Sequence, residues 1–186
     1  MIQQVRIEQA ISSILEGIGE DLTRDGLRET PQRVGQMYRD LFSGVGQDPQ
    51  AAIDAVFELE SNDPIVLGNV PFYSVCEHHL LPFFGQAHMA YIPNGKIAGL
   101  SKLARALEVA SRRLQVQERL TGQVADAIFS ALNPHGVAVE VEAEHLCMSM
   151  RGVQKPGSRV TTFAVRGRFE ACAIDRDGLL ALLHRR

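Results

Sequence analysis

Two separated runs of cysteine and histidine constrain the fold of this 186-residue chain more than any other feature. The first run is Cys76-Glu77-His78-His79, and the second is His145-Leu146-Cys147. Cys76 and His79 are close enough in sequence for one turn of chain to direct both at a single metal ion. Cys147 would be the third ligand, so the fold must bring the two runs together. Three nitrogen and sulfur ligands suit zinc and leave a fourth position for water, which becomes a nucleophile near neutral pH.

Two further histidines flank the expected ligands. His78 directly precedes His79, and His145 lies two positions before Cys147, where a group that transfers protons would be useful. The alternative is that the cysteines are small buried apolar residues, as free cysteines often are, and that the histidines form a surface patch. The concentration of both residue types in two short runs favours the metal site.

Composition indicates a globular protein of one domain with an appended segment. Its hydrophobic content of 45% is ordinary for such proteins. We find no window of membrane-span length and no signal-peptide pattern, and we expect no membrane partner. Three cysteines are too few for a disulfide framework, so we expect a reducing, cytoplasmic location. Two of them are the expected ligands, and Cys172 is interpreted as structural or incidental.

The charge pattern indicates a small anionic ligand. The net charge of −3 argues against a general nucleic-acid surface, and we expect no nucleic-acid partner. Basic residues nevertheless concentrate in the second half of the chain: Arg105, Arg112, Arg113, Arg119, Arg151, Lys155, Arg159, Arg166 and Arg168. Such a cluster in an acidic chain suits a small polyanion. The alternative is a solvated surface of scattered arginines.

The first third of the chain has helical periodicity. Apolar residues between Val5 and Ile18 recur at helical spacing. Thr30-Pro31 predicts the start of a second helix, with Thr30 as its cap, and Asp48-Pro49 repeats the pattern before a third. These segments carry no clustered ligands. We therefore interpret residues 1–60 as an N-terminal helical segment for packing or assembly and residues 61–186 as the catalytic domain.

From about Ile65 the period changes to two, which indicates strands. One helix is predicted to begin near Ser101, and another to end at Asn133-Pro134. A strand over residues 137–147 places alternate valines on one face, and continued alternation would put His145 and Cys147 on that buried face. The pattern is α+β: a mainly antiparallel sheet with helices packed against it.

The start of the helix near Ser101 suits a phosphate. Ser101 is expected to cap it, with Lys102 and Arg105 close behind. Free N–H groups and the dipole favour an anion there, and cations at that end are otherwise slightly unfavourable. Ordinary capping with solvated cations is the alternative interpretation.

Glu118 is a candidate for recognising guanine. A carboxylate can accept two parallel hydrogen bonds, which the N1–H and amino group of guanine offer and adenine does not. The surrounding run from Gln115 to Thr121 is polar. From composition alone, a polar segment between two helices is more often simply solvated.

These runs, in this order, resemble the GTP cyclohydrolase I family, and the likeness extends from about Asp25 to Arg168. The similar segments are Cys76-Glu77-His78-His79, Gly99-Leu100-Ser101-Lys102, Gln115-Val116-Gln117-Glu118-Arg119-Leu120-Thr121, His145-x-Cys147-x-x-x-Arg151-Gly152, Glu29-Thr30-Pro31-x-Arg33-Val34 and Leu41-Phe42-Ser43-Gly44. Leu114 stands where the family often has proline, and Leu146 where an aromatic residue is common. Neither departure removes a reactive group.

The resemblance implies the tunnelling fold (T-fold). In that fold each subunit contributes an antiparallel sheet with two packed helices, and the sheets join into a toroidal oligomer. Family members are typically homodecamers of two pentamers, with active sites at subunit interfaces. The implied reaction converts GTP and water to formate and 7,8-dihydroneopterin triphosphate, the first step towards folate or tetrahydrobiopterin.

The resemblance also implies a role for each matching position. Zinc would be held by Cys76, His79 and Cys147. Protons would be transferred by His78, His145 and Ser101. Guanine would be held by Gln117 with Glu118, and the ribose and triphosphate by Ser101, Lys102, Arg105 and Arg151.

Three other functions remain open from the residues. Another T-fold enzyme acting on a purine or pterin would be expected to use a different ligand set, such as three histidines. A non-catalytic, zinc-stabilised, GTP-binding assembly protein would need a fourth protein ligand. A regulatory nucleotide-binding module would bind GTP without turnover.

Overall fold

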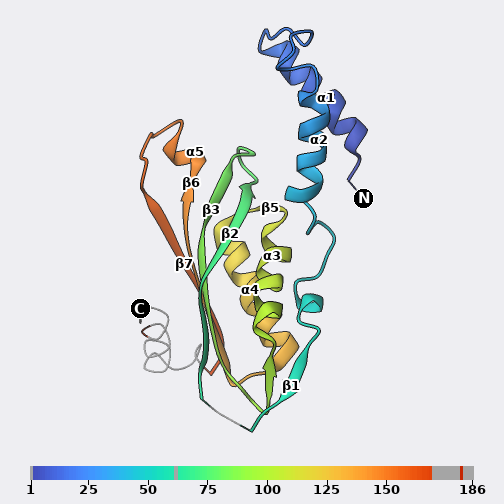
Figure 1. The fold of residues 1–186 in the computed structure, drawn as a ribbon. Helices are drawn as coiled ribbons and strands as arrows, with labels where there is room; N and C mark the ends of the chain where they lie inside the picture. The colour runs from blue at the N-terminus through green and yellow to red at the C-terminus, as the bar shows by residue number, and fades with distance from the viewer. Residues whose placement is uncertain (1, 61–62, 169–180, 182–186) are drawn as a thin grey trace. The chain divides into compact units, whose positions relative to one another are not determined.

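The computed structural model describes residues 2–60, 63–168 and 181 (Figure 1). The prediction for Cys172, and the tail after Phe169, therefore fall outside the described residues. The chain divides into two compact units, Met1–Ser43 and Gly44–Arg186. None of the helices in the described part of the chain combines the length and the apolar character that a bilayer span requires.

The first unit is a pair of packed helices, α1 (Gln4–Gly17) and α2 (Thr30–Leu41). Gly35 is buried in α2, and a Cβ atom there would lie 2.8 Å from Cγ of Glu8, so the missing side chain permits close approach of the two helices. Both predicted helices are confirmed. Thr30 is itself helical, however, and Glu29 occupies the N-cap position.

The second unit is built on a five-stranded sheet with the strand order β5–β2–β3–β6–β7. The strands are β2 (Ile65–Cys76), β3 (Pro82–Ile92), β5 (Leu114–Gln115), β6 (Gly136–His145) and β7 (Arg159–Gly167). All neighbouring pairs are antiparallel except β2 with β5, which is parallel. The mainly antiparallel sheet predicted from the period-two pattern is confirmed.

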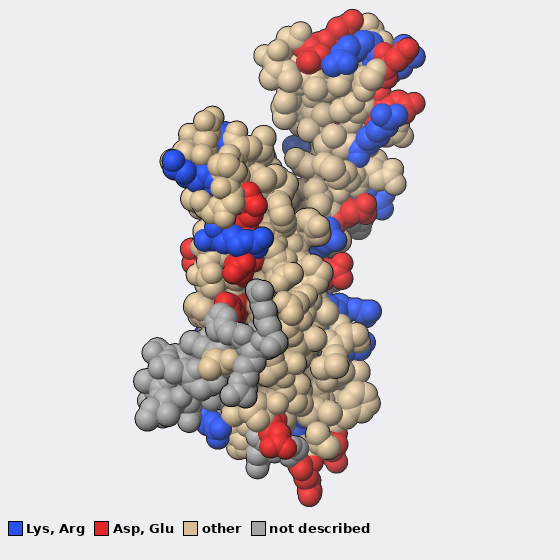
Figure 2. Space-filling view, turned by 60° about the vertical axis from the view of Figure 1, so that its left-hand side comes forward, with Lys and Arg blue, Asp and Glu red and all other residues tan. Residues whose placement is uncertain are grey.

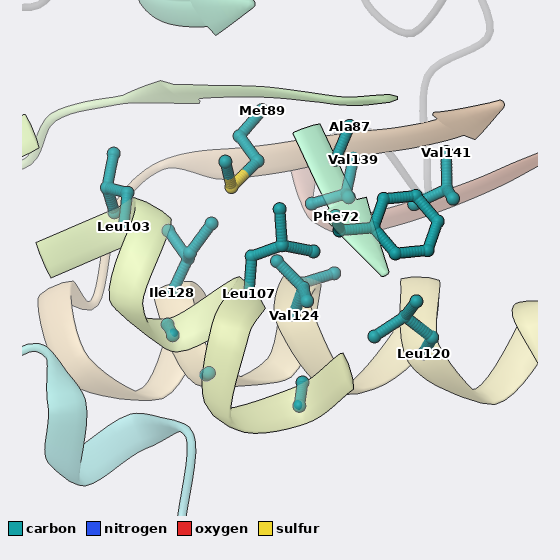
Figure 3. Close-up of a cluster of buried hydrophobic side chains, with 14 of the residues drawn as sticks. Phe72, Ala87, Met89, Leu103, Leu107, Leu120, Val124, Ile128, Val139 and Val141 are labelled. Carbon is teal, nitrogen blue, oxygen red and sulfur yellow. The ribbon is translucent and has the colours of Figure 1, made fainter. Parts of the chain in front are cut away.

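Two helices, α3 (Leu100–Ser111) and α4 (Gln117–Leu132), cover one face of this sheet (Figure 1). The core lies between the two layers, where apolar side chains of β2, β3 and β6 meet those of both helices (Figure 3). Its members include Phe72, Ala87, Met89, Leu103, Leu107, Leu120, Val124, Ile128, Val139 and Val141. Burying each of the larger of these side chains contributes on the order of 1.5–3 kcal/mol. The α+β class is therefore confirmed.

The segment after Asp48-Pro49 differs from the prediction. It forms only a single 3₁₀ turn, η1 (Gln50–Ala52), and then strand β1 (Val56–Glu58), which pairs with β4 (Lys96–Ala98). The backbone bonds of this segment are thus made within the second unit. Arg113 adds to this by donating to the carbonyl oxygens of Gly44 and Gln47 at 2.6 and 2.8 Å. By compactness the boundary lies between residues 43 and 44, whereas the sequence suggested residue 60.

The strand predicted over residues 137–147 ends at His145. The chain then turns into a short helix, α5 (Leu146–Ser149), in which the N–H of Met150 donates to the carbonyl of Leu146 at 3.0 Å. Val137, Val139 and Val141 are buried together as predicted. The alternation does not extend to Cys147, however, because that residue is helical.

Candidate metal and nucleotide site

The three expected metal ligands converge at one end of the sheet. Cys76 is the buried last residue of β2, and His79 lies in the tight loop that leads into β3. The loop is closed by backbone bonds between Cys76 and Leu80 and between Cys76 and Leu81, each 2.9 Å. Cys147 approaches from α5. The Sγ atoms of both cysteines and a ring nitrogen of His79 all lie within 4.8 Å of one another.

This donor set fits a thiophilic transition metal. Two sulfur atoms bound to one zinc ion are at most about 4.6 Å apart, so the observed spacing requires little adjustment. Burial raises the pKa of the Cys147 thiol, and the neighbouring Cys76 raises it further. A bound cation would offset this resistance to ionisation. Among the described residues, no fourth cysteine, histidine or carboxylate joins the group.

The loop that carries Cys76 and His79 is tied to the start of α4. Glu77 forms an ion pair with Arg119, and its backbone N–H donates to the carbonyl of Gln115 at 3.1 Å. Hydrogen bonding to Arg119 lowers the pKa of Glu77, although burial opposes the shift. Arg119 also donates from Nε to Oε1 of the fully buried Gln115 at 2.9 Å. Neither the spacing nor the composition of the sequence indicates this anchoring role of Glu77 and Arg119.

His145 is held in a defined orientation at the end of β6. Its ring stacks on Phe83, with centroids 4.6 Å apart and an interplanar angle of 3°. Its Nε2 lies 2.7 Å from Oε1 of Gln117. Burial lowers the pKa of His145, and the charge of Glu118 partly opposes this. A half-buried imidazole with a lowered pKa therefore lies two residues from the expected ligand Cys147.

Gln117 and Glu118 begin α4 but occupy different surroundings. Gln117 is only 2% exposed, and its amide lies between His145 and the strands β6 and β7. Glu118 is exposed, and its charge acts on His145. Glu118 is therefore free to meet a ligand beside His145. The side chain of Gln117 is already bonded to protein groups, and the guanine contact expected of Gln117 with Glu118 stays a prediction.

Ser101, Lys102 and Arg105 lie at the start of α3. Gly99, not Ser101, is the N-cap residue, so the predicted capping role of Ser101 is wrong. Ser101 is the second residue of the helix and, together with Arg105, lines a cavity of about 430 Å³ against β2. Lys102 forms an ion pair with Asp54 at 2.5 Å.

Within one chain, these three residues are distant from the metal ligands. The far end of α3 is next to the end of β2, because Ser74 Oγ donates to the carbonyl of Ser111 at 2.7 Å. A helix of twelve residues is about 18 Å long. The start of α3 therefore lies well away from Cys76 and α5, beside the middle of β2, where Ser101 and Arg105 share a pocket with Val70 (Figure 1).

The remaining predicted residues border the three expected metal ligands, Cys76, His79 and Cys147, which we call the metal group. His78 is exposed, with its ring centroid 6.4 Å from that of His79. Arg151 is exposed in the segment after α5, and its charge partly opposes the burial that raises the pKa of Cys147. The structure thus gathers Cys76, His78, His79, Gln117, Glu118, His145, Cys147 and Arg151 at one end of the sheet.

Not all of the basic residues in the second half are available for an anion. Arg159 pairs with Glu142 at 3.0 Å, and Arg166 with Asp126 at 2.5 Å. On the face shown in Figure 2, Lys and Arg side chains lie among Asp and Glu and form no continuous basic surface. Part of the predicted basic cluster therefore stabilises the fold.

An α+β fold that brings two thiols and an imidazole together beside an oriented histidine has an arrangement that suits a metal-dependent enzyme. Comparison with known proteins agrees: a sequence profile described as GTP cyclohydrolase I matches residues 7–184. The chain belongs to the GTP cyclohydrolase I family, which confirms the resemblance found in its motifs.

The similar curated proteins match this chain over nearly its whole length. GTP cyclohydrolase 1 of Geobacillus kaustophilus (strain HTA426) is 55% identical, covering 98% of this chain and 97% of the relative. The Carboxydothermus hydrogenoformans protein of that name is 52% identical, covering 98% and 96%. That of Streptococcus agalactiae serotype V is 50% identical over the whole of both chains. A solved structure, the archaeosine synthase QueF-Like in the apo form, matches 58% of this chain and 97% of its own at 21% identity, with a TM-score of 0.47, too weak a likeness to bear on the fold.

Proposed function

We propose that this protein is a zinc-dependent GTP cyclohydrolase I that converts GTP and water to formate and 7,8-dihydroneopterin triphosphate. This reaction is the first step of pterin synthesis towards folate or tetrahydrobiopterin. The observation that carries the proposal is the convergence of Cys76, His79 and Cys147 beside His145 in a chain of this family. The purified protein tests it directly, through formate release and the fluorescence of the oxidised pterin.

The ligand set supports zinc as the resident metal. Two thiolates and one imidazole are donors that zinc accepts readily, with one coordination position left for water. When bound, zinc supplies Lewis acidity and an activated water for hydrolysis. The three-ligand group in the described residues also favours an enzyme over an assembly protein, which would need a fourth protein ligand. Cys76 and Cys147 are free thiols, which supports a reducing, cytoplasmic location.

The residues around the metal group supply binding and proton transfer. Glu118 accepts from N1–H and the amino group of guanine, which orients the imidazole edge of the purine towards His145. His145 takes up a proton from the attacking water and delivers it to N7 as C8 is hydrolysed. His78 and Ser101 move protons in the later rearrangement of the ribose. Arg151, Lys102 and Arg105 neutralise the triphosphate.

Replacing Glu118 by glutamine is expected to weaken GTP binding and reduce the preference for GTP over ATP. Glutamine can accept only one of the two hydrogen bonds, and its amino group opposes the other donor. A bidentate pair of this kind is worth about 1–3 kcal/mol of discrimination, which is roughly 5- to 150-fold in affinity. Equilibrium binding of GTP and ATP to both proteins measures the effect.

Metal content is the internal control for this variant, because Glu118 is not among the three ligands and zinc per chain should not change. If the variant keeps the wild-type preference for GTP, other groups recognise guanine.

We further infer that each active site is assembled from more than one copy of the chain. The separation of Ser101, Lys102 and Arg105 from the metal group supports this, because a neighbouring subunit would bring the start of its α3 to the site. Among the described strands, β7 is at one edge of the sheet, and the other edge carries only the two-residue β5. Open edges of this kind favour pairing with another chain. We propose the T-fold and a toroidal homodecamer of two pentamers, as the family resemblance implies.

Two inactive variants are expected to restore each other's activity when they are assembled together. His145→Ala damages the metal end of a subunit, and Arg105→Ala damages the start of α3. If the metal ligands of a site come from one subunit and the start of α3 from its neighbour, some mixed sites contain both parts unmutated. In a 1:1 random mixture, these are roughly one quarter of the sites. The measurement is formate release after joint dissociation and reassembly.

The control is each variant taken through the same reassembly alone, which should remain inactive. Failure of the mixture to regain activity, although both variants are shown to co-assemble, would place all the groups of a site in one chain.

A further inference from the structure

The side chain of Gln117 is buried within a polar network that reaches His145. Its Nε2 donates to the carbonyl oxygens of Val141 in β6 and Val160 in β7, each at 2.9 Å. The hydroxyl of Thr162 lies 3.2 Å from the same nitrogen. With 2% of its surface exposed, this side chain is surrounded by protein. Its position depends on the paired strands beneath it.

This network determines which way the amide points. Backbone carbonyl oxygens can only accept hydrogen bonds, so the atom between Val141 and Val160 must be the amide nitrogen. The amide oxygen of Gln117 then faces Nε2 of His145 at 2.7 Å. Because an amide oxygen also only accepts, Nε2 of His145 must carry the hydrogen.

The hydrogen on Nε2 determines the state of Nδ1, the other ring nitrogen of His145. A neutral imidazole has one hydrogen, so a hydrogen on Nε2 leaves the lone pair on Nδ1. The stack on Phe83 at an interplanar angle of 3° restricts rotation of the ring about this hydrogen bond. Both the tautomer and the plane of His145 are therefore set by groups that lie outside the metal ligands.

We propose that Gln117 is a positioning residue that holds His145 in the Nε2-protonated tautomer and presents Nδ1 as the nitrogen that exchanges a proton with substrate. The proton exchange between Nδ1 and substrate rests on the proposed function, whereas the tautomer does not. It replaces the guanine contact implied for the Gln117 side chain, because such a contact would require breaking the bonds to Val141, Val160 and His145.

The tautomer can be observed without any substrate. Solid-state ¹⁵N NMR of the full-length, zinc-loaded protein, labelled at histidine nitrogens, should show a hydrogen on Nε2 of His145. The His145 signals are identified by their loss in His145→Asn. A hydrogen on Nδ1 with none on Nε2 would overturn the proposal.

A variant gives the functional test. Gln117→Met has a similar length but no hydrogen-bonding amide, so the saturated turnover should fall about 10- to 100-fold, the usual range for an outer partner of this kind. The Kd for GTP and the zinc content should remain near wild type, because in this proposal the Gln117 side chain contacts neither guanine nor the metal. Thr162→Val is the matched control, since it removes one contact of Gln117 but leaves the bond to His145, and its turnover should remain near wild type.

The opposite kinetic pattern would contradict the proposal. If Gln117→Met weakened GTP binding as Glu118→Gln is expected to, with saturated turnover unchanged, then Gln117 would bind guanine. Should Gln117→Met not fold, the NMR measurement on the wild-type protein still decides. Absence of formate release by the wild-type protein would refute the proposed function alone, because the tautomer is measured independently of turnover.

Discussion

Replacing Cys147 by alanine is expected to leave a folded protein that no longer retains its metal and releases formate at least roughly 10³-fold more slowly, because the activated water is lost with the metal. Cys147 lies on the four-residue α5 and is only half-buried, so the sheet and its core should persist. The measurements are metal per chain after dialysis and the rate of formate release from GTP.

Met150→Ala is the matched control for this variant. Met150 follows α5 directly and is 61% exposed, so its loss should affect neither metal content nor rate. A Cys147→Ala protein that kept one tightly held metal per chain and wild-type turnover would show that the metal group is not the reactive centre.

Replacing His145 by alanine is expected to reduce turnover by about 10²- to 10⁴-fold, the contribution typical of a positioned general acid or base. Zinc should remain bound, because His145 is not one of the three converging ligands. GTP should still bind, because Glu118 is retained. Stopped-flow measurement of ring opening, with GTP binding measured separately, distinguishes lost chemistry from lost affinity.

Ser149→Ala serves as the control for this region. Ser149 donates to Glu144 at 2.7 Å and to the carbonyl of His145 at 3.2 Å, so its removal tests whether general loosening of the strand end affects the rate. Near wild-type formate release by His145→Ala would show that another group transfers the proton.

The parts of this fold that depend on local pattern were predictable. The helices α3 and α4 follow from apolar residues at helical spacing, and β3 and β6 from alternation, since these periods directly reflect helix and strand geometry. The metal group was predictable because Cys76 and His79 are neighbours in sequence and only Cys147 had to be supplied by the fold.

The errors arose where local pattern was extended too far. Alternation in β6 was continued to Cys147, although the chain becomes helical after His145. Ser101 was assigned as a cap because serine favours that position, but the helix begins one residue earlier, at Leu100. Asp48-Pro49 resembles a helix start, yet only a single 3₁₀ turn follows it before the chain enters β1 and pairs with β4.

The features that could not be predicted depend on long-range register. The amide of Gln117 meets Val141 and Val160 only because β6 and β7 pair beside α4. The ion pair between Glu77 and Arg119 likewise joins residues 42 positions apart. No spacing rule indicates such partners, because they follow from the packing of α4 on the sheet.

The most direct test of the account is formate release from GTP by the purified protein, measured for the metal-free form and after addition of one equivalent of zinc per chain. We predict no release without metal, restoration by zinc, and one formate for each 7,8-dihydroneopterin triphosphate formed. The Cys147→Ala protein should not respond to zinc. Equal formate release with and without metal, or tight binding of GTP with no formate released by the zinc-loaded protein, would contradict the account.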